Sequence, residues 1–139
     1  MSFDKAKLLR NAERYLSQGK VRAAIGEYKR IVEHDPKDYG TLNTLGDLYV
    51  RDSDKTEAVK CYTSVAEYYG KQGFAQKAIA IYNKILRLNP ESPDVLLKLA
   101  QFYQQKGSPA EARVHYSNLA EYYKKQGRKG DALDVWKQI

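Results

Sequence analysis

Apolar residues recur every three or four positions along most of the chain, with charged and polar residues between them. This spacing is typical of amphipathic helices, which repeat every 3.6 residues, and no segment shows the strict alternation of a strand. The predicted helices cover about 3–18, 21–34, 39–51, 55–71, 74–88, 93–105, 109–126 and 128–139. Because turns of only two to five residues connect them, the pattern predicts an all-α fold of about eight antiparallel helices.

Polar and glycine residues mark the expected helix ends. Gly19 suits the position just after the first helix, because glycine adopts the left-handed conformation without a side-chain clash. Asp54 precedes Glu57 by three residues, and Ser108 precedes Glu111 by the same spacing. Both pairs are typical of a capping box, in which the first side chain bonds the backbone N–H three residues later.

A long block of the sequence occurs twice. Residues 65–73 read VAEYYGKQG, and residues 119–127 read LAEYYKKQG, an offset of 54 residues. At the same offset, Ala132 and Trp136 stand where Ala78 and Tyr82 stood. An internal repeat of this kind indicates stacked helical units. The chain is therefore a repeat protein whose function has to be inferred from its surfaces.

Small and aromatic residues also fall on a 34-residue register. From residue 5, positions 4, 8, 11, 15, 20, 24 and 32 hold Leu8, Ala12, Tyr15, Gly19, Ala24, Tyr28 and Pro36. Equivalent residues follow from residues 39 and 93. This pattern resembles the tetratricopeptide repeat family over essentially the whole chain, in a bacterial-type arrangement of fused 54-residue three-helix modules. The resemblance implies a right-handed α-solenoid.

The expected organisation is one domain, 1–139, in which some repeats share a helix. The repeats lie near 5–38, 39–72, 59–92, 93–126 and 113–139, the last of them truncated. Tyr62 is then position 24 of one repeat and position 4 of the next, so the helix at 55–71 closes one pair and opens the following one. We expect the chain to be the N-terminal part of a longer array.

The net charge of +7 is unevenly distributed. Residues 1–70 hold 12 Lys and Arg against 11 Asp and Glu, and residues 71–139 hold 12 against 6. Such a basic half suits an acidic partner, a nucleic acid or a membrane surface, although a solvated surface explains it more simply. No stretch predicts a membrane span or a signal peptide, and one cysteine excludes an internal disulfide. A cytoplasmic protein is the expectation.

No residue cluster indicates catalysis. His34 and His115 have no acidic or thiol partner at ligand spacing, and Cys61 stands 54 residues before His115, in an equivalent packing position. We therefore expect no catalytic residue, no metal site, no cofactor and no enzyme activity. Most of the twelve tyrosines occupy repeat positions that pack helix against helix. Tyr68 and Tyr122 fall outside that register, which makes them the better candidates for a contact with a partner or at the seam between modules.

The family resemblance implies that one polar face of the helices lines a concave groove. Its residues would be Asn43, Asp47, Arg51, Lys60, Ser64, Glu67, Lys71, Lys98, Gln101, Gln105, Asn118, Glu121 and Lys125. The basic clamp of the subclass that binds chaperone C-termini is matched only at Lys60, which disfavours that ligand. The leading hypothesis is a non-catalytic scaffold that binds a peptide or helix of a partner protein. The alternative is a basic helical repeat that binds nucleic acid or another polyanion.

The last helix carries apolar residues that no later helix in the sequence covers. They are Leu133, Trp136 and Ile139, which we expect to be partly exposed. A repeat array needs a polar cap on its terminal face, and monomers rarely expose a large apolar patch. Either a longer array covers this face or it is a homodimer interface. In both cases we expect self-association through this helix.

Overall fold

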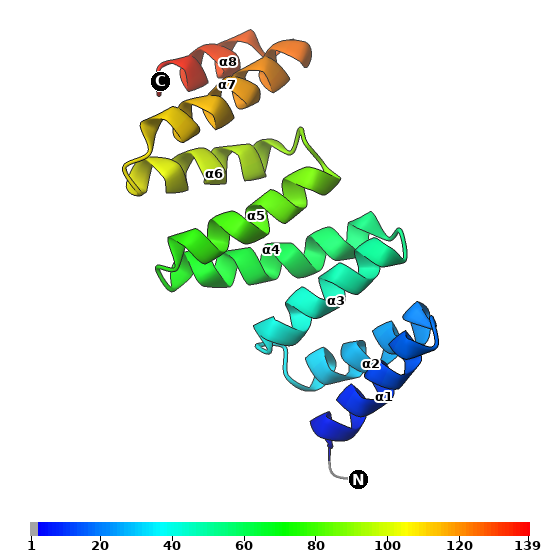
Figure 1. The fold of residues 1–139 in the computed structure, drawn as a ribbon. Helices are drawn as coiled ribbons and strands as arrows, with labels where there is room; N and C mark the ends of the chain where they lie inside the picture. The colour runs from blue at the N-terminus through cyan, green and yellow to red at the C-terminus, as the bar shows by residue number, and fades with distance from the viewer. Residues whose placement is uncertain (1–2) are drawn as a thin grey trace. The chain divides into compact units, whose positions relative to one another are not determined.

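The computed structural model describes residues 3–139, and within that range the chain is entirely helical, with no strand (Figure 1). It divides into two compact units, Met1–Glu67 and Tyr68–Ile139. The helices are α1 Lys5–Ser17, α2 Val21–His34, α3 Tyr39–Arg51, α4 Lys55–Lys71, α5 Ala75–Leu88, α6 Pro93–Gln105, α7 Pro109–Lys125 and α8 Lys129–Trp136. The boundary between the units lies inside α4.

In the first unit, each helix packs against the next one along the chain, α1 on α2 and α2 on α3. The residues at the closest approaches are small: Ala12, Ala24 and Ala58 are completely buried. Gly46 of α3 is also buried, and the ring of Tyr62 from α4 lies directly over its Cα. Side chains this small let two helix backbones approach closely, which explains why alanine and glycine occupy the repeat positions.

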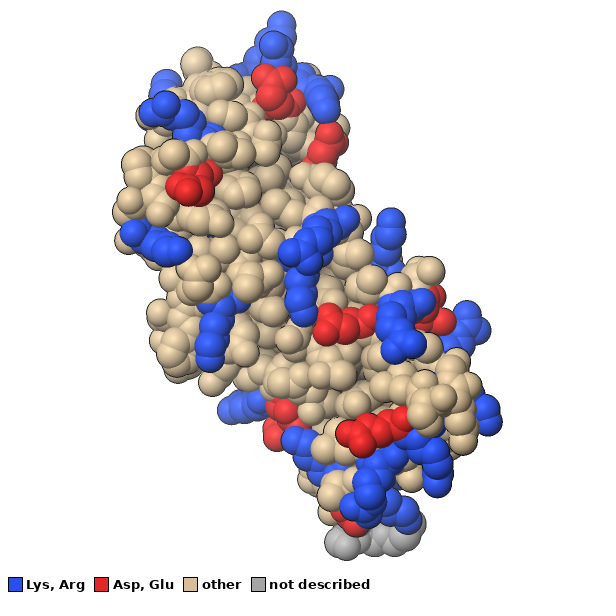
Figure 2. Space-filling model, viewed as in Figure 1, with Lys and Arg blue, Asp and Glu red and all other residues tan. Residues whose placement is uncertain are grey.

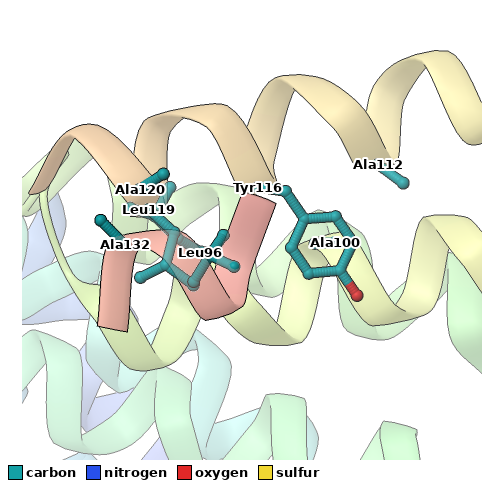
Figure 3. Packing of buried hydrophobic residues seen from close by; sticks show 8 residues of the cluster. Leu96, Ala100, Ala112, Tyr116, Leu119, Ala120 and Ala132 are labelled. Carbon is teal, nitrogen blue, oxygen red and sulfur yellow. The ribbon is translucent and has the colours of Figure 1, made fainter. Parts of the chain in front are cut away.

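In the second unit, α5 packs on α6, α6 on α7 and α7 on α8. Residues from the last three helices form one buried cluster (Figure 3). Its members are Leu96, Ala100, Ala112, Tyr116, Leu119, Ala120, Ala132 and Val135. In it, the side chains of Leu96, Leu119 and Ala132 lie close together, so that residues of three helices fill one space. The predicted all-α fold of antiparallel neighbouring helices is confirmed.

Of the two expected capping boxes, only the first shows the hydrogen bond from the N-cap side chain. The Asp54 carboxylate accepts a hydrogen bond from the Glu57 backbone N–H at 3.2 Å, as expected of an N-cap. Ser108 also stands at an N-cap, but its side chain makes no capping hydrogen bond, so that prediction was wrong. Pro109 follows it and has no N–H to be satisfied, which leaves α7 one fewer free donor at its start.

Five helices end in the same backbone turn. In each one, a residue with positive φ follows the helix, and the next N–H bonds back to a tyrosine carbonyl five residues earlier, the pattern of a Schellman motif. The residues with positive φ are Gly19, Ser53, Gly73, Gly107 and Gly127. Ser53, with φ 61°, is the only one of the five with a side chain.

We expect Ser53→Gly to stabilise the protein. A side chain in the left-handed conformation costs about 1 kcal/mol relative to glycine, so the substitution should raise the midpoint of thermal unfolding by roughly 3 °C. The matched reverse change is Gly107→Ser, because Gly107 (φ 80°) occupies the same turn 54 residues later. It should lower the midpoint by a similar amount. Equal midpoints for both variants in a circular dichroism melt would contradict this account.

Candidate protein-binding surface

We call the thirteen groove residues expected from the sequence the predicted groove surface. Six lie in the first unit, on α3 and α4: Asn43, Asp47, Arg51, Lys60, Ser64 and Glu67. All are exposed except Asn43, which is half-buried. On α3 they recur every four residues, and the neighbouring Leu45 and Leu48 are buried. The amphipathic pattern of α3 therefore turns this polar row toward solvent.

Buried tyrosines fix the orientation of two polar side chains. The hydroxyl of Tyr62 donates a hydrogen bond to the Asp47 carboxylate, and Tyr62 itself is buried. In the second unit, the Tyr116 hydroxyl donates to the Gln104 side-chain oxygen at 2.8 Å. Each tyrosine thus packs its ring in the core while its hydroxyl reaches a polar side chain of the neighbouring helix. The sequence analysis missed Gln104, although its spacing of three residues from Gln101 places both on one side of α6.

The remaining seven residues of the predicted groove surface lie in the second unit, and all are exposed. Lys71 ends α4, and the others divide between α6 and α7: Lys98, Gln101, Gln105, Asn118, Glu121 and Lys125. Lys125 is 2.9 Å from Glu91, and the pairing raises the pKa of Lys125. Such exposed pairs contribute little stability, so Lys125 is available to exchange Glu91 for another carboxylate.

Two exposed apolar side chains accompany these polar residues. Leu97 on α6 precedes Lys98 in the chain, and Val114 on α7 lies four residues before Asn118. Val114 is equivalent to Lys60 at the 54-residue offset. The sequence repeat could therefore have placed Val114 in the predicted groove surface. Apolar side chains beside cationic and amide groups supply the mixture of contacts that peptide-binding surfaces use.

Cys61 and His115, two residue types often found in reactive sites, are packing residues here. Cys61 is buried, and burial raises the pKa of its thiol to about 11, so it stays protonated and unreactive at neutral pH. His115 stacks on Tyr103 at 5.5 Å, its Nδ1 has no hydrogen-bond partner, and burial lowers its pKa. Among residues 3–139, no group of three or more His, Cys, Asp or Glu could hold a metal ion.

The three apolar residues expected at the end of the chain are exposed. Leu133 and Trp136 lie on α8, and Ile139 lies beyond its end, because α8 stops at Trp136 and is shorter than predicted. We call Leu133, Trp136 and Ile139 together the α8 face. The self-association expected from them stays a prediction.

Positive charge dominates the surface of the second unit. It carries 12 Lys and Arg against 6 Asp and Glu. Figure 2 shows many blue side chains and fewer red ones across the viewed face of the molecule. Within residues 3–139, no helix has the length and apolar character needed to cross a membrane. An acidic ligand is therefore the electrostatic complement of this unit.

Two family models match the sequence, and both are described as tetratricopeptide repeat. One matches residues 9–67 and the other residues 71–128, so together they cover most of both units. Among curated proteins, the BBSome complex member BBS4 from Bos taurus is 27% identical over 117 residues. The match covers 75% of this chain and 22% of BBS4, so the chain spans about a fifth of the length of that relative.

Several solved structures are similar to the chain. A tetratricopeptide repeat protein from Parabacteroides merdae is 22% identical, with a TM-score of 0.44, and the match covers 94% of this chain and 58% of that one. TTC0263, a thermophilic repeat protein from Thermus thermophilus, is 18% identical, with a TM-score of 0.41 and coverage of 97% and 89%. MamA is 19% identical, with a TM-score of 0.40 and coverage of 99% and 93%.

Proposed function

This chain belongs to the tetratricopeptide repeat family, and from that premise we propose that it is a non-catalytic scaffold that binds a peptide or helix of a partner protein along the predicted groove surface. Members of the family typically bind other proteins and are generally not enzymes. BBS4, the distant relative, is a member of a complex, and a role in holding proteins together is compatible with that.

The observation that supports the proposal is that α3 in the first unit and α6 in the second unit each expose a row of polar side chains and bury their opposite side. Tyr62 orients Asp47 in one unit, and Tyr116 orients Gln104 in the other. Orienting a polar group before binding reduces the entropy lost when a ligand binds. The exposed Leu97 and Val114 add apolar contacts. A surface with these properties suits an extended or helical peptide with carboxylates and a few apolar side chains.

The repeat organisation is part of the same proposal. We infer that α4 and α7 each close one repeat and open the next, as the overlapping repeats 39–72 with 59–92 and 93–126 with 113–139 require. A helix shared in this way needs a wide apolar arc, and α4 buries Ala58, Cys61, Tyr62, Val65 and Ala66. Groove-lining residues would then come from α4 and α7 as well as from α3 and α6.

Charge reversal tests the proposal. We expect the triple variant Lys71→Glu, Lys98→Glu and Lys125→Glu to lose the partner that the unaltered protein retains in a pull-down from the native lysate. At least a tenfold loss of retained partner is expected, because three attractions become repulsions. The matched control reverses three other exposed cations of the same unit, Arg87, Arg113 and Lys124. The control has the same net charge and should keep the partner. Equal losses in both variants would contradict the proposed surface.

The basic second unit favours one alternative, binding of nucleic acid or another polyanion. Salt distinguishes the two functions, because affinity dominated by phosphate contacts falls by orders of magnitude between about 50 and 200 mM salt. A peptide surface with apolar contacts should weaken far less. RNA or DNA that remains bound at about 200 mM salt would support the alternative and contradict the scaffold proposal.

A further inference from the structure

The turn between α4 and α5 carries an exposed aromatic ring. Phe74 is 49% exposed and follows Gly73, one of the five residues with positive φ that end a helix. The ring packs edge-on against Tyr69 with 6.4 Å between centroids, the hydrophobic contact usual in a Schellman motif. That contact still leaves Phe74 half exposed. In the other four turns, polar residues stand at the same place: Lys20, Asp54, Ser108 and Arg128.

The turn that bears Phe74 has its backbone donors already satisfied. Residues 71–74 are exposed one after another, so the ring projects from the surface. The N–H groups of Gln72, Gly73 and Phe74 donate to carbonyl oxygens of α4 at 3.0, 3.2 and 2.9 Å. A turn of this kind can enter a poorly hydrated environment without leaving those donors unpaired.

Two lysine side chains lie beside this turn. Nζ of Lys77 is 5.2 Å from the centroid of the Phe74 ring and 5.5 Å from that of Tyr69. Lys106, just after α6, donates a hydrogen bond to the side-chain oxygen of Gln76, the residue before Lys77. Both lysines are exposed. We call Phe74, Gln76, Lys77 and Lys106 together the Phe74 patch.

Carboxylates are scarce around the Phe74 patch. Residues 68–110 contain six Lys and Arg, and their only acidic residues are Glu91 and Asp94. Both lie where α5 ends and α6 begins, which is the opposite end of these two helices from Phe74. Glu91 is moreover paired with Lys125 at 2.9 Å. Neither carboxylate therefore neutralises the lysines of the patch.

The acidic residues that flank this segment do not reverse its charge. They are Glu67 on α4 and Glu111 on the first turn of α7. Even with both counted, Lys71, Lys77 and Lys106 leave an excess of positive charge. The whole second unit adds to it, with 12 Lys and Arg against 6 Asp and Glu. The electrostatic complement of the patch is an anionic surface.

A lipid bilayer suits a projecting ring better than a peptide does. A binding site for a peptide encloses the side chains of its ligand, whereas a ring that projects from a turn has to enter its partner. The interfacial region of a bilayer accepts aromatic rings without a preformed pocket. Its anionic headgroups also attract lysine side chains close to the surface.

We propose that the Phe74 patch binds the surface of an anionic lipid bilayer, with the Phe74 ring inserted among the headgroups and Lys77 and Lys106 in contact with their negative charges. The binding is peripheral and reversible, because one aromatic ring and a few lysines make a weak anchor. It is separate from binding along the predicted groove surface. The chain can therefore hold a protein partner while it is attached to a membrane.

Vesicle sedimentation tests the proposal. The probe is a vesicle of 70% phosphatidylcholine and 30% phosphatidylserine, at about 100 mM salt. We expect the protein to sediment with it and to bind pure phosphatidylcholine vesicles at least tenfold more weakly, because the attraction needs anionic lipid. Absence of binding to the anionic vesicles would overturn the proposal.

Phe74→Ser separates insertion from charge alone. It introduces the residue that stands in the equivalent turn at Ser108 and should weaken vesicle binding at least fivefold, because the inserted apolar surface is lost. The matched control is Val114→Ser, an exposed apolar residue on α7, which should bind within twofold of the unaltered protein. Both sites are exposed, so both variants should keep the helical circular dichroism spectrum. Equal binding by the two variants would overturn the role of Phe74.

A tryptophan at the turn reports whether it enters the bilayer. Trp136→Phe removes the only native tryptophan, and Phe74→Trp in that background places a single indole at the turn. We expect its emission to shift to the blue with anionic vesicles and to be quenched by lipids brominated in their acyl chains. Val114→Trp in the same background should show neither effect. An indole at residue 74 that stays in water on bound vesicles would overturn the proposal.

Charge reversal locates the cationic part of the site. Lys77→Glu with Lys106→Glu should weaken binding to anionic vesicles at least tenfold. The control pair, Arg87→Glu with Arg113→Glu, reverses two other exposed cations of the unit and has the same net charge, and it should weaken binding less than threefold. Equal losses would mean diffuse attraction by the unit and overturn the patch. Phe74→Ser leaves the predicted groove surface intact and should retain the partner in the pull-down, so the two proposals can fail separately.

Discussion

Leu119→Ala is expected to lower the free energy of unfolding by about 2–5 kcal/mol, the range for a fully buried leucine whose removal leaves a cavity. Leu119 is 1% exposed and lies between helices in the cluster formed by α6, α7 and α8 (Figure 3). The neighbouring Ala120 and Ala132 are too short to fill the space that it leaves. Urea unfolding followed by circular dichroism measures the difference.

The matched control is Leu133→Ala, which removes the same atoms from a side chain exposed to solvent on α8. Its expected effect is within about 0.5 kcal/mol, because no cavity forms and little apolar area is lost from the core. Similar destabilisation by the two substitutions would mean that Leu133 is covered in solution, which the self-association predicted from the sequence would produce. The protein concentration should therefore be varied in both measurements.

Gly46→Ala is expected to destabilise the protein by about 1–3 kcal/mol, the usual cost of overpacking a core. A Cβ atom at this position would lie 2.6 Å from Cε1 of Tyr62, too close for any real contact. The ring cannot move aside easily, because Tyr62 is buried and its hydroxyl bonds Asp47. The clash outweighs the gain of about 1 kcal/mol that alanine normally brings to a helix interior.

Gly26→Ala is the control, since Gly26 lies within α2 and an added Cβ would meet nothing within 4 Å. Helix propensity then acts alone, and we expect a stabilisation of about 0.5–1 kcal/mol. The two identical substitutions should therefore change the midpoint of thermal unfolding in opposite directions. A shift of the same sign in both would show that α3 and α4 do not approach as closely as Gly46 and Tyr62 indicate.

Repeated sequence positions predicted the helices and much of the core. The expected helices at 21–34, 39–51 and 55–71 match α2, α3 and α4 to the residue, because glycine, proline and capping residues mark their ends locally. The alanines of the repeat register are buried, as a close approach of helices requires. The end of α8 was predicted three residues too late, because apolar spacing alone does not show where a terminal helix stops.

The polar side chains of the predicted groove surface were placed on exposed faces by periodicity, but their partners were not visible in the sequence. The hydrogen bond from Tyr62 to Asp47 joins two helices, and the ion pair of Lys125 with Glu91 joins residues 34 positions apart. Such contacts depend on how neighbouring helices cross and on rotamers chosen in context. Local spacing along one helix contains neither kind of information.

The reason for a glycine at residue 70 is likewise not visible in the sequence. Gly70 interrupts the otherwise matching blocks 65–73 and 119–127, where Lys124 takes its place, and the sequence offers no reason for the difference. In the structure, a Cβ at Gly70 would lie 3.0 Å from the Phe102 ring of α6. The sequence by itself determined the helices, their repeat register and the faces they bury, because these follow from periodic spacing along one chain. Only the tertiary structure decided that the Phe102 ring lies close to Gly70 and that the Tyr62 ring leaves no room for a Cβ atom at residue 46, because these contacts depend on which side chains meet across helices.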